Sequence, residues 1–321
     1  MLRLVARCTQ GVAVVLLASS IAFFLMKFAK GDPFPTAGES ASYNEAVHAY
    51  RRAQMGLDEP LPVQYGRWLG SIARGDFGIS NQPGNRKVSR IILDALPITV
   101  VLMSLALIAS AIAGIALGAW QGAHAKSRWE RATNALGVVL YAVPEFWLAT
   151  ILVFVFALRL PIFPVEGVSE PGATYGTTRS ILDVAWHLFL PWLSLTLVGT
   201  AIFARYQQAA MRDVLSEMFV RTARAKGVSE SAVLRQHALR VAILPVITIG
   251  GLFFPALLTG AVLIETVFSR PGLGRVLTAA VSNRDYYVVT GVVIVGSAMT
   301  AVGTFLADIL REKYDPRLRD Q

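Results

Sequence analysis

The chain has 321 residues, of which 54% are hydrophobic and only 16% are charged, and its mean hydropathy is +0.52. This balance excludes an ordinary soluble chain and predicts an integral membrane protein with room for several helical spans. The single cysteine, Cys8, excludes an internal disulfide and a cysteine-based metal cluster, and the net charge of +9 is assigned to positively charged inner loops and not to nucleic-acid binding.

The amino-terminal region, residues 1–30, holds the first expected span. Its apolar run, residues 11–29, follows a short start that carries Arg3 and Arg7. Such a start also describes a secretory signal, with residues 18–20 near a cleavage site. Because the run exceeds a typical signal core, we expect an uncleaved helix that spans the membrane with its amino terminus inside.

Residues 31–95 are polar and form the second expected region, a small external subdomain. Gly31-Asp32-Pro33 breaks the first helix, residues 39–55 read as a surface helix, and a stretch with glycine and proline at 56–62 ends it. Trp68 follows in a weakly amphipathic stretch. Two interpretations stay open, in which Trp68 rests on the outer membrane interface or packs inside the subdomain.

Five further apolar runs bring the predicted number of transmembrane helices to six: residues 96–120, 133–158, 187–204, 246–268 and 287–310. The inner ends and loops of this all-α arrangement hold sixteen lysines and arginines, whereas the two short outer loops hold five. Both termini are therefore expected to be cytoplasmic. The third region is a five-span core, residues 96–310, with a cytoplasmic loop at 205–245, and residues 311–321 form a cytoplasmic tail.

Small residues are frequent in the later spans. Gly114 and Gly118 are four residues apart, which places them on one face of a helix. We expect them to let two helices of the bundle approach closely.

Signatures of catalysis and of metal binding are missing from the sequence. It contains no G-x-x-x-x-G-K-[ST] phosphate loop, no His-Glu-x-x-His and no G-x-S-x-G. The four histidines have no metal-ligand spacing among them: His48, His124, His187 and His237. The sequence therefore predicts no enzyme activity, no metal site and no means of hydrolysing ATP within this chain.

Glu145 is the one ionisable residue near the middle of an expected span. Beside the helix-breaking Pro144, it is interpreted either as lining a translocation pathway together with Phe146 or as bonding backbone groups that Pro144 frees. The other candidates are expected near span ends, where water or headgroups reach them: Asp94, His187, Glu265 and Asp308.

The polar segment 205–245 lies between two apolar runs, so it is expected outside the membrane. Residues 207–226 are mostly good helix formers, and Gly227 is placed to end that helix in a left-handed turn. Ser229 is expected to cap a second helix, residues 230–241, before Pro245 opens the next span. The segment is then a helical hairpin held out from the membrane.

The centre of this segment suggests a docking surface. Small alanines are expected to permit close approach of a partner protein, and basic side chains to pair with its acidic groups. The residues are Ala223 and Ala225 for the first role, and Arg221, Arg224 and Lys226 for the second. A solvated hairpin with ordinary inside-positive charge is the alternative.

Residues 221–227, Arg221-Thr222-Ala223-Arg224-Ala225-Lys226-Gly227, together with 237–240 and 244–245, resemble the coupling loop of permease subunits in bacterial ATP-binding cassette importers. The dipeptide, oligopeptide and nickel subgroup is the most similar. Further motifs resemble it in order and spacing: Gly31-Asp32-Pro33, Gly56-Leu57-Asp58, Gln64-Tyr65, Gly75-Asp76-Phe77-Gly78, Pro144-Glu145-Phe146-Trp147, Glu265-Thr266-Val267-Phe268, Pro271-Gly272-Leu273-Gly274-Arg275, Arg284-Asp285-Tyr286 and Asp315-Pro316-Arg317. Thr304 and Arg311 depart from the subgroup, which leaves the packing of the last span open.

The resemblance implies half of a heterodimer in the bacterial inner membrane, a multi-pass subunit surrounded by lipid. Its partners would be a homologous permease, two ATPase subunits that bind ATP and Mg, and an external substrate-binding protein. Residues 221–227 would form the coupling helix on an ATPase subunit. Peptides are the implied cargo, with nickel chelates, glutathione or sugars as alternatives, and an ATP-independent secondary transporter is a further alternative.

Overall fold

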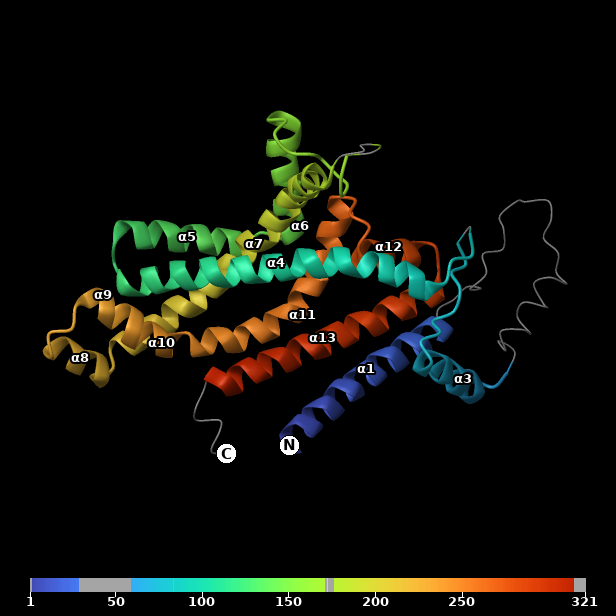
Figure 1. The fold of residues 1–321 in the computed structure, drawn as a ribbon, viewed down its shortest axis with the longest axis horizontal. Helices are drawn as coiled ribbons and strands as arrows, with labels where there is room; N and C mark the ends of the chain where they lie inside the picture. Colours follow the sequence, from blue (N-terminus) through green and yellow to red (C-terminus); the bar gives the residue numbers. More distant parts are fainter. Residues whose placement is uncertain (1, 29–58, 83, 171, 173–175, 315–321) are drawn as a thin grey trace. The chain divides into compact units, whose positions relative to one another are not determined.

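The computed structural model describes residues 2–28, 59–82, 84–170, 172 and 176–314 (Figure 1). The surface helix expected at 39–55 lies outside these residues, as does most of the expected tail. The described residues are mostly helical, and they divide into two compact units, Met1–Leu96 with Val276–Ala298 and Pro97–Arg275 with Met299–Gln321. An all-α fold is therefore confirmed for the described part of the chain.

The helices of the described residues are as follows, in chain order. Before the polar segment 205–245 they are α1 (Leu2–Phe28), α3 (Leu61–Ala73), α4 (Val88–Ala123), α5 (Arg128–Ala142), α6 (Glu145–Val153), the π-helix η1 (Phe154–Arg159) and α7 (Thr177–Leu215). From there on they are α8 (Met218–Ala225), α9 (Glu230–Ala232), the π-helix η2 (Val233–Ala238), α10 (Leu239–Ala242), α11 (Leu244–Val267), α12 (Leu273–Ser282) and α13 (Tyr286–Tyr314).

Within the described part of the chain, three helices are each long and apolar enough to cross a membrane: α4, α7 and α13. Two bent pairs raise the number to five when each pair counts as one span, namely α5 with α6 and η1, and Glu230–Ala242 with Leu244–Gly251. Within α1, Thr9–Leu25 is a shorter apolar stretch. These helices agree in position with the apolar runs of the sequence.

The expected single span at residues 133–158 is broken. Helices α5 and α6 meet at an angle of 103°. Pro144 lacks a backbone N–H and clashes with a helical residue before it, so Val143 is extended, with φ −81° and ψ 128°. The chain therefore leaves α5 and starts a new helix at Glu145.

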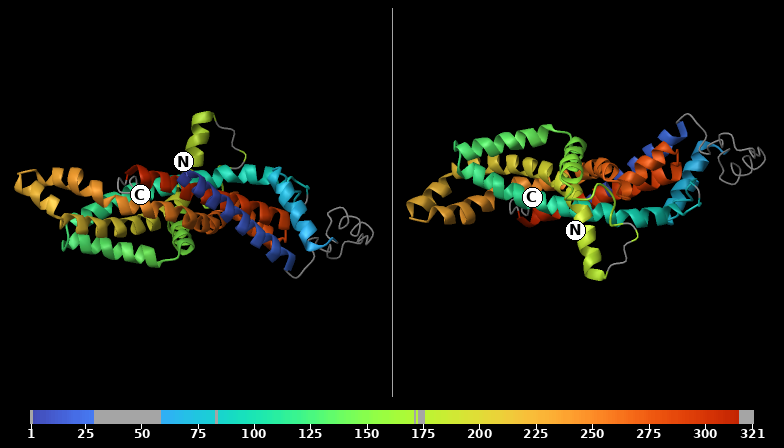
Figure 2. Two further views of the ribbon diagram at one scale, coloured as in Figure 1. Left: turned by 90° about the horizontal axis from the view of Figure 1, so that it is seen from below. Right: turned by 90° about the horizontal axis from the view of Figure 1, so that it is seen from above.

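Close helix packing organises the second unit, in which α5 and α7 lie side by side (Figure 2). Gly118 and Gly122 of α4 face α7. A Cβ added at Gly118 would lie 2.7 Å from Cβ of Gln207, and one added at Gly122 would lie 2.6 Å from Cβ of Met211. Gly114 likewise faces Phe203. The close approach expected for Gly114 and Gly118 is confirmed, and Gly122 extends the same stripe.

Glu265 was expected within reach of water, and this expectation was wrong. Its side chain is fully buried near the end of α11. Oε1 accepts a hydrogen bond from Oγ1 of Thr99 at 2.6 Å, and Oε2 accepts from the backbone N–H groups of Gly274 at 2.7 Å and Arg275 at 3.3 Å. The carboxylate caps the amino terminus of α12, which explains how a charge is tolerated there.

Gly272 makes room for this cap. A Cβ at position 272 would overlap the carboxylate of Glu265. The Oγ1 of Thr99 also accepts a hydrogen bond from the N–H of Leu273 at 2.8 Å, so one hydroxyl joins α4 to both partners of the cap.

In the first unit, half-buried Trp68 packs against other aromatic rings. Its ring centroid lies 4.9 Å from that of Phe23 in α1 and 5.8 Å from that of Tyr65 in α3. The hydroxyl of Tyr65 is also 2.7 Å from that of Ser20. Trp68 therefore packs against α1 as well as within α3, and this packing is compatible with both interpretations made from the sequence.

The same unit contains a buried carboxylate that caps α13. Asp285 is 1% exposed, and its Oδ2 accepts hydrogen bonds from the hydroxyl of Ser80 at 2.5 Å and from the N–H of Asn81 at 3.2 Å. Its Oδ1 accepts from the N–H of Val288 at 3.3 Å. The loop that carries Ser80 and Asn81 is thereby fixed to the start of α13.

Candidate functional site

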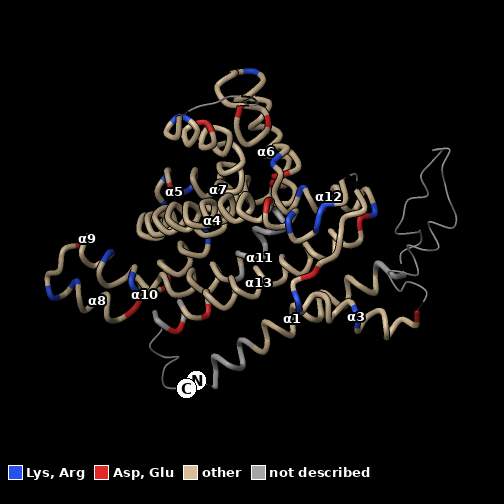
Figure 3. The backbone as a smooth tube through the Cα atoms, turned by 45° about the vertical axis from the view of Figure 1, so that its right-hand side comes forward, with Lys and Arg blue, Asp and Glu red and all other residues tan. Residues whose placement is uncertain are grey.

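The polar segment between α7 and α11 folds as a separate small structure at the end of α7 (Figures 1 and 2). It contains α8, α9, η2 and α10, and lysine and arginine residues are spread along it (Figure 3). It holds every residue that the sequence predicts for coupling, from Arg221 to Gly227.

One continuous helix was expected up to Lys226, but α7 ends at Leu215. The hydroxyl of Ser216 bonds to the carbonyl of Asp213 at 2.7 Å, and Glu217 adopts an extended conformation with φ −69° and ψ 150°. A serine that bonds to the nearby backbone competes with helix continuation. Helix α8 is therefore an independent helix, able to present its own face.

Gly227 ends α8 in the left-handed turn that the sequence predicts, with φ +78°. The N–H of Gly227 donates to the carbonyl of Arg224 at 3.0 Å, and the N–H of Val228 donates to the carbonyl of Ala223 at 3.3 Å. These two bonds form a Schellman motif, which satisfies the last carbonyls of α8.

Ala223 lies inside the segment. Its side chain is 7% exposed and packs with Val220 of α8 and Val233 of η2, both fully buried. Val228, just after the Schellman turn, packs against the same cluster. The small side chain of Ala223 therefore serves the packing of α8 onto η2.

The basic residues of α8 differ in their surroundings. Arg224 forms a bidentate pair with Glu230, from Nε to Oε2 at 3.0 Å and from Nη2 to Oε1 at 2.6 Å. The hydrogen bond from Arg224 lowers the pKa of the Glu230 carboxyl. Arg221 and Lys226 are exposed on the same helix, as are Thr222 and Ala225.

Two apolar side chains on α8 belong to its exposed surface but were not predicted from the sequence. Met218 is 73% exposed and Phe219 is 42% exposed, although both are large and hydrophobic. The sequence does show an apolar group here, because Met218 and Phe219 precede Val220 in an otherwise polar segment. It does not show which of these three side chains is buried. Together with Arg221, Ala225 and Lys226 they form the exposed surface of α8.

The second helix expected at 230–241 is present as three joined pieces, α9, η2 and α10. Ser229 holds the position before α9, but its backbone carbonyl accepts the bonds from Ala232 and Val233, each at 2.9 Å, while its side chain makes no capping bond. Ala238 and Ala242 are fully buried against Met211 of α7. This packing fixes the hairpin to the last turns of α7.

Glu145 and Phe146, the candidates for a translocation pathway, begin α6 directly after the break. Glu145 is half-buried, and Phe146 is 45% exposed. A carboxylate in the first turn of a helix is favoured by the helix dipole. The geometry is compatible with both interpretations made from the sequence.

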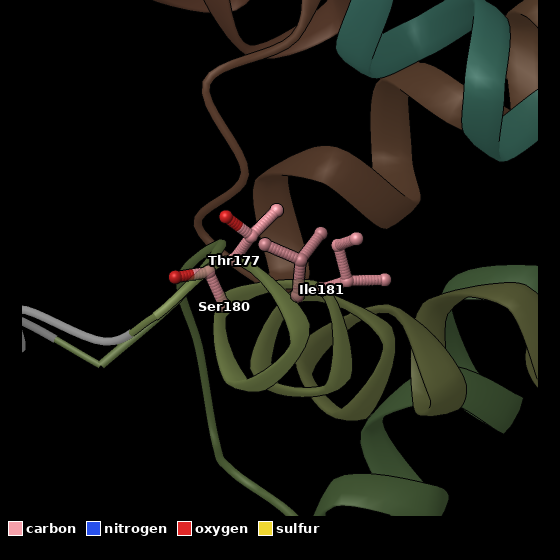
Figure 4. A pocket seen from close by; sticks show the side chains of 4 residues that line it. Thr177, Ser180 and Ile181 are labelled. Atoms are coloured by element: carbon pink, nitrogen blue, oxygen red, sulfur yellow. The ribbon is translucent and has the colours of Figure 1, made fainter.

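An open pocket lies on the first turns of α7, far along the helix from α8. Thr177, Ser180, Ile181 and Val184 line it (Figure 4). None of these side chains is ionisable. Among the residues that the structure describes, no group of three or more His, Cys, Asp or Glu side chains is placed to hold a metal ion.

Two family models match the chain. The family model described as "Binding-protein-dependent transport system inner membrane component" matches residues 114–320. The amino-terminal model of the same group, "Binding-prot-dependent transport system membrane comp, N-term", covers residues 1–103. Together they account for nearly the whole chain.

Several relatives are similar over nearly full length. The oligopeptide transport system permease protein AppB of Bacillus subtilis is 35% identical and covers 98% of both chains. OppB of Haemophilus influenzae, described by the same words, is 33% identical over 98% of this chain and 97% of its own. A putative peptide transport system permease protein of Brucella abortus is 37% identical with the same coverage.

A solved structure supports the fold. The crystal structure of an amino acid ABC transporter with histidines is 14% identical, with a TM-score of 0.53, and covers 70% of this chain and 94% of its own. The chain therefore belongs to the family of binding-protein-dependent transport system inner membrane components, membrane permeases of ABC transporters and not enzymes.

Proposed function

We propose that this chain is one of two permease subunits of an ATP-driven importer that carries peptides across the bacterial inner membrane. A homologous permease would complete the pathway, and an external binding protein would deliver the cargo. Two ATPase subunits would hold ATP and Mg. The observation that carries the proposal is α8, a short helix separate from α7 and packed on η2, with an exposed apolar and basic surface.

The membrane arrangement has six spans with both termini in the cytoplasm. Its spans are α1, α4, the bent pair of α5 with α6 and η1, α7, α11 and α13. The excess of lysine and arginine in the inner segments supports this orientation, because such residues are retained on the cytoplasmic side. The segment from α8 to α10 then faces the ATPase subunits.

Coupling requires that ATP-driven movement of an ATPase subunit reaches the spans. Phe219 and Met218 offer the ATPase apolar contact area, while Arg221 and Lys226 offer charge. The core of Val220 and Ala223 keeps α8 attached to η2 when it is pushed. Within residues 221–227, Arg221 and Lys226 would contact the ATPase, and Ala223 would hold α8 on η2 beneath that surface.

Peptides are the proposed cargo because AppB and OppB are named oligopeptide permeases. Half-buried Glu145 and exposed Phe146 at the start of α6 would line the path. A peptide carries a positively charged amino terminus as well as apolar side chains, and a carboxylate beside an aromatic ring offers contacts to both kinds of group.

The test uses vesicles that contain the whole importer, with binding protein and labelled peptide outside and ATP at the ATPase side. Arg221→Glu is expected to weaken ATPase attachment and to lower peptide-stimulated ATP hydrolysis by about tenfold, since a repelling charge replaces a contact. Arg131→Glu, which changes an exposed side chain in the first turn of α5, is the charge-matched control.

Unchanged stimulation in Arg221→Glu would contradict the role of α8. Uptake of peptide without ATP would contradict an ATP-driven importer altogether. Insertion of both variants is checked by the amount of chain recovered from purified membranes.

A further inference from the structure

Glu130, in the first turn of α5, is a buried carboxylate whose partners lie on another helix. Ser127 caps α5, and its hydroxyl accepts a hydrogen bond from the N–H of Glu130 at 3.0 Å. In a complete capping box the glutamate side chain would turn back to the N–H of the capping serine. Here the carboxylate, 4% exposed, points to α7 instead.

On α7 this carboxylate meets two donors one turn apart. Its Oε1 accepts a hydrogen bond from Nε2 of Gln208 at 2.8 Å and another from Nη2 of Arg212 at 2.8 Å. The Arg212 side chain is 44% exposed, so the cation keeps part of its hydration while the carboxylate is buried. A hydrogen bond between an ionised donor and an ionised acceptor is stronger than one between neutral groups.

The same turns of α7 carry the candidate docking segment on other faces. Met211 packs against Ala238 and Ala242 of the η2–α10 region. Val214 and Leu215 pack against the core of α8 and η2. The last turns of α7 thus contact α5 through Glu130 and contact α8 and α10 through apolar side chains.

Helix α4 completes the arrangement. Gly122 packs so closely on Met211 of α7 that a Cβ added at position 122 would lie 2.6 Å from Cβ of Met211. Nε2 of Gln121, 2% exposed, donates to Oγ1 of Thr133 in α5 at 3.0 Å. Three helices are therefore joined at the level where α7 leads to α8.

We propose that Glu130 is a positioning residue for energy coupling: it fixes the end of α7 to α5, so that a displacement of α8 moves α4, α5 and α7 as one body. The inference rests on the proposed coupling role of α8. Without Glu130, α8 would still dock on the ATPase, but the end of α7 would move against α5, and the displacement would be lost before it reached α4 and α5.

The experiment measures peptide molecules imported per ATP hydrolysed in vesicles that contain the complete importer. Glu130→Gln keeps the size of the side chain and removes its charge; it is expected to retain ATPase association and ATP hydrolysis, but to lower import per ATP by about tenfold, within the usual range of coupling between sites. Asp213→Asn is the matched control, since Asp213 is an exposed carboxylate next to Arg212. It is expected to leave the ratio unchanged.

A second variant separates positioning from simple destabilisation. Glu130→Arg combined with Arg212→Glu restores a charge pair between the same two helices, and it is expected to recover import per ATP to within about threefold of the unaltered importer. The inference is overturned if Glu130→Gln imports as much peptide per ATP as Asp213→Asn. It is also overturned if Glu130→Gln lowers ATPase association and import in equal proportion, or if the exchanged pair recovers nothing.

These outcomes are distinct from failure of the proposed function. If the unaltered importer shows no ATP-dependent uptake, or if Arg221→Glu leaves ATP hydrolysis and uptake intact, the coupling role of α8 fails. If the unaltered importer works and Arg221→Glu is defective, while Glu130→Gln is fully coupled, the role of Glu130 alone fails.

Discussion

Gly227 has a φ of +78°, a backbone conformation that side chains with a Cβ rarely adopt. An added Cβ would meet no atom within 4 Å. The requirement for glycine is therefore conformational and not steric. The Schellman motif and the packing of Val228 onto the core of α8 both depend on this one turn.

Gly227→Val should strain the turn, because a left-handed conformation costs a residue with a Cβ about 1–2 kcal/mol. We expect peptide-stimulated ATP hydrolysis to fall several-fold while the chain still inserts. The measurement is ATPase activity of the reconstituted importer with and without loaded binding protein.

Gly176→Val is the matched control for that change. Gly176 also has open space around its Cα, but its φ of −64° and ψ of 158° suit valine. Equal activity of the two variants would show that the left-handed turn is not needed.

The docking residues were predictable as a group but not one by one. Nothing in the sequence distinguishes Ala223 from Ala225, yet Ala223 is buried and Ala225 is exposed. The difference arises because the chain folds back after Gly227 and brings Val233 onto one face of α8. Arg224 likewise has a partner, Glu230, only because of this reversal.

At the scale of helices, the start of α12 is the clearest case of a motif explained by structure. Glu265 lies on α11, eight residues before the helix that it caps, and Thr99 on α4 bonds to both. Residues 265–268 and 271–275 resemble two separate family motifs in the sequence, and the contact with α4 shows that both belong to one helix cap.

Glu265→Ala should destabilise the protein strongly. The change leaves the N–H of Gly274 and the hydroxyl of Thr99 without their acceptor in a buried place, and each unsatisfied group costs about 1–3 kcal/mol. We expect a lower midpoint of thermal unfolding in detergent, with Glu265→Gln less affected because it keeps an acceptor oxygen.

Glu166→Ala serves as the comparison for this change, because Glu166 is an exposed glutamate of the same unit. If Glu265→Ala unfolds at the same temperature as Glu166→Ala, the carboxylate does not support α12.

Neither helix break was predicted, although the sequence carried a signal of different strength for each. Pro144 marked the end of α5 in the sequence, because proline restricts the residue before it and has no N–H to donate. The angle of 103° between α5 and α6 depends on packing and could not be predicted. Ser216 gave a weaker signal, since serine ends a helix only where its hydroxyl bonds to the backbone.

For the whole molecule, the single cysteine makes the proposed orientation testable. In a Cys8→Ser background, Ala225→Cys is expected to react with a membrane-impermeant thiol reagent only after the cells are opened. Thr177→Cys, at the start of α7, is expected to react in intact cells, since it lies on the outer side of the proposed arrangement. Mass spectrometry or gel shift reports the labelled fraction.

Reversed labelling of these two positions would contradict cytoplasmic termini. Labelling of both in intact cells, with membranes shown to be sealed, would contradict the number of spans between them. The number and order of apolar runs were available from the sequence, but their division into whole and bent spans depends on breaks such as the one at Pro144.

The length of α7 sets the distance at which the ATPase subunits would work. At about 1.5 Å per residue, the helix of 39 residues is roughly 58 Å long, about twice the thickness of the hydrocarbon core. Its apolar run ends at residue 204, so the eleven residues from Arg205 to Leu215 form a stalk of about 16 Å. Headgroups occupy about 6 Å of that stalk. An ATPase subunit would thus meet α8 in water, clear of the lipid surface, and its attachment should depend little on headgroup composition.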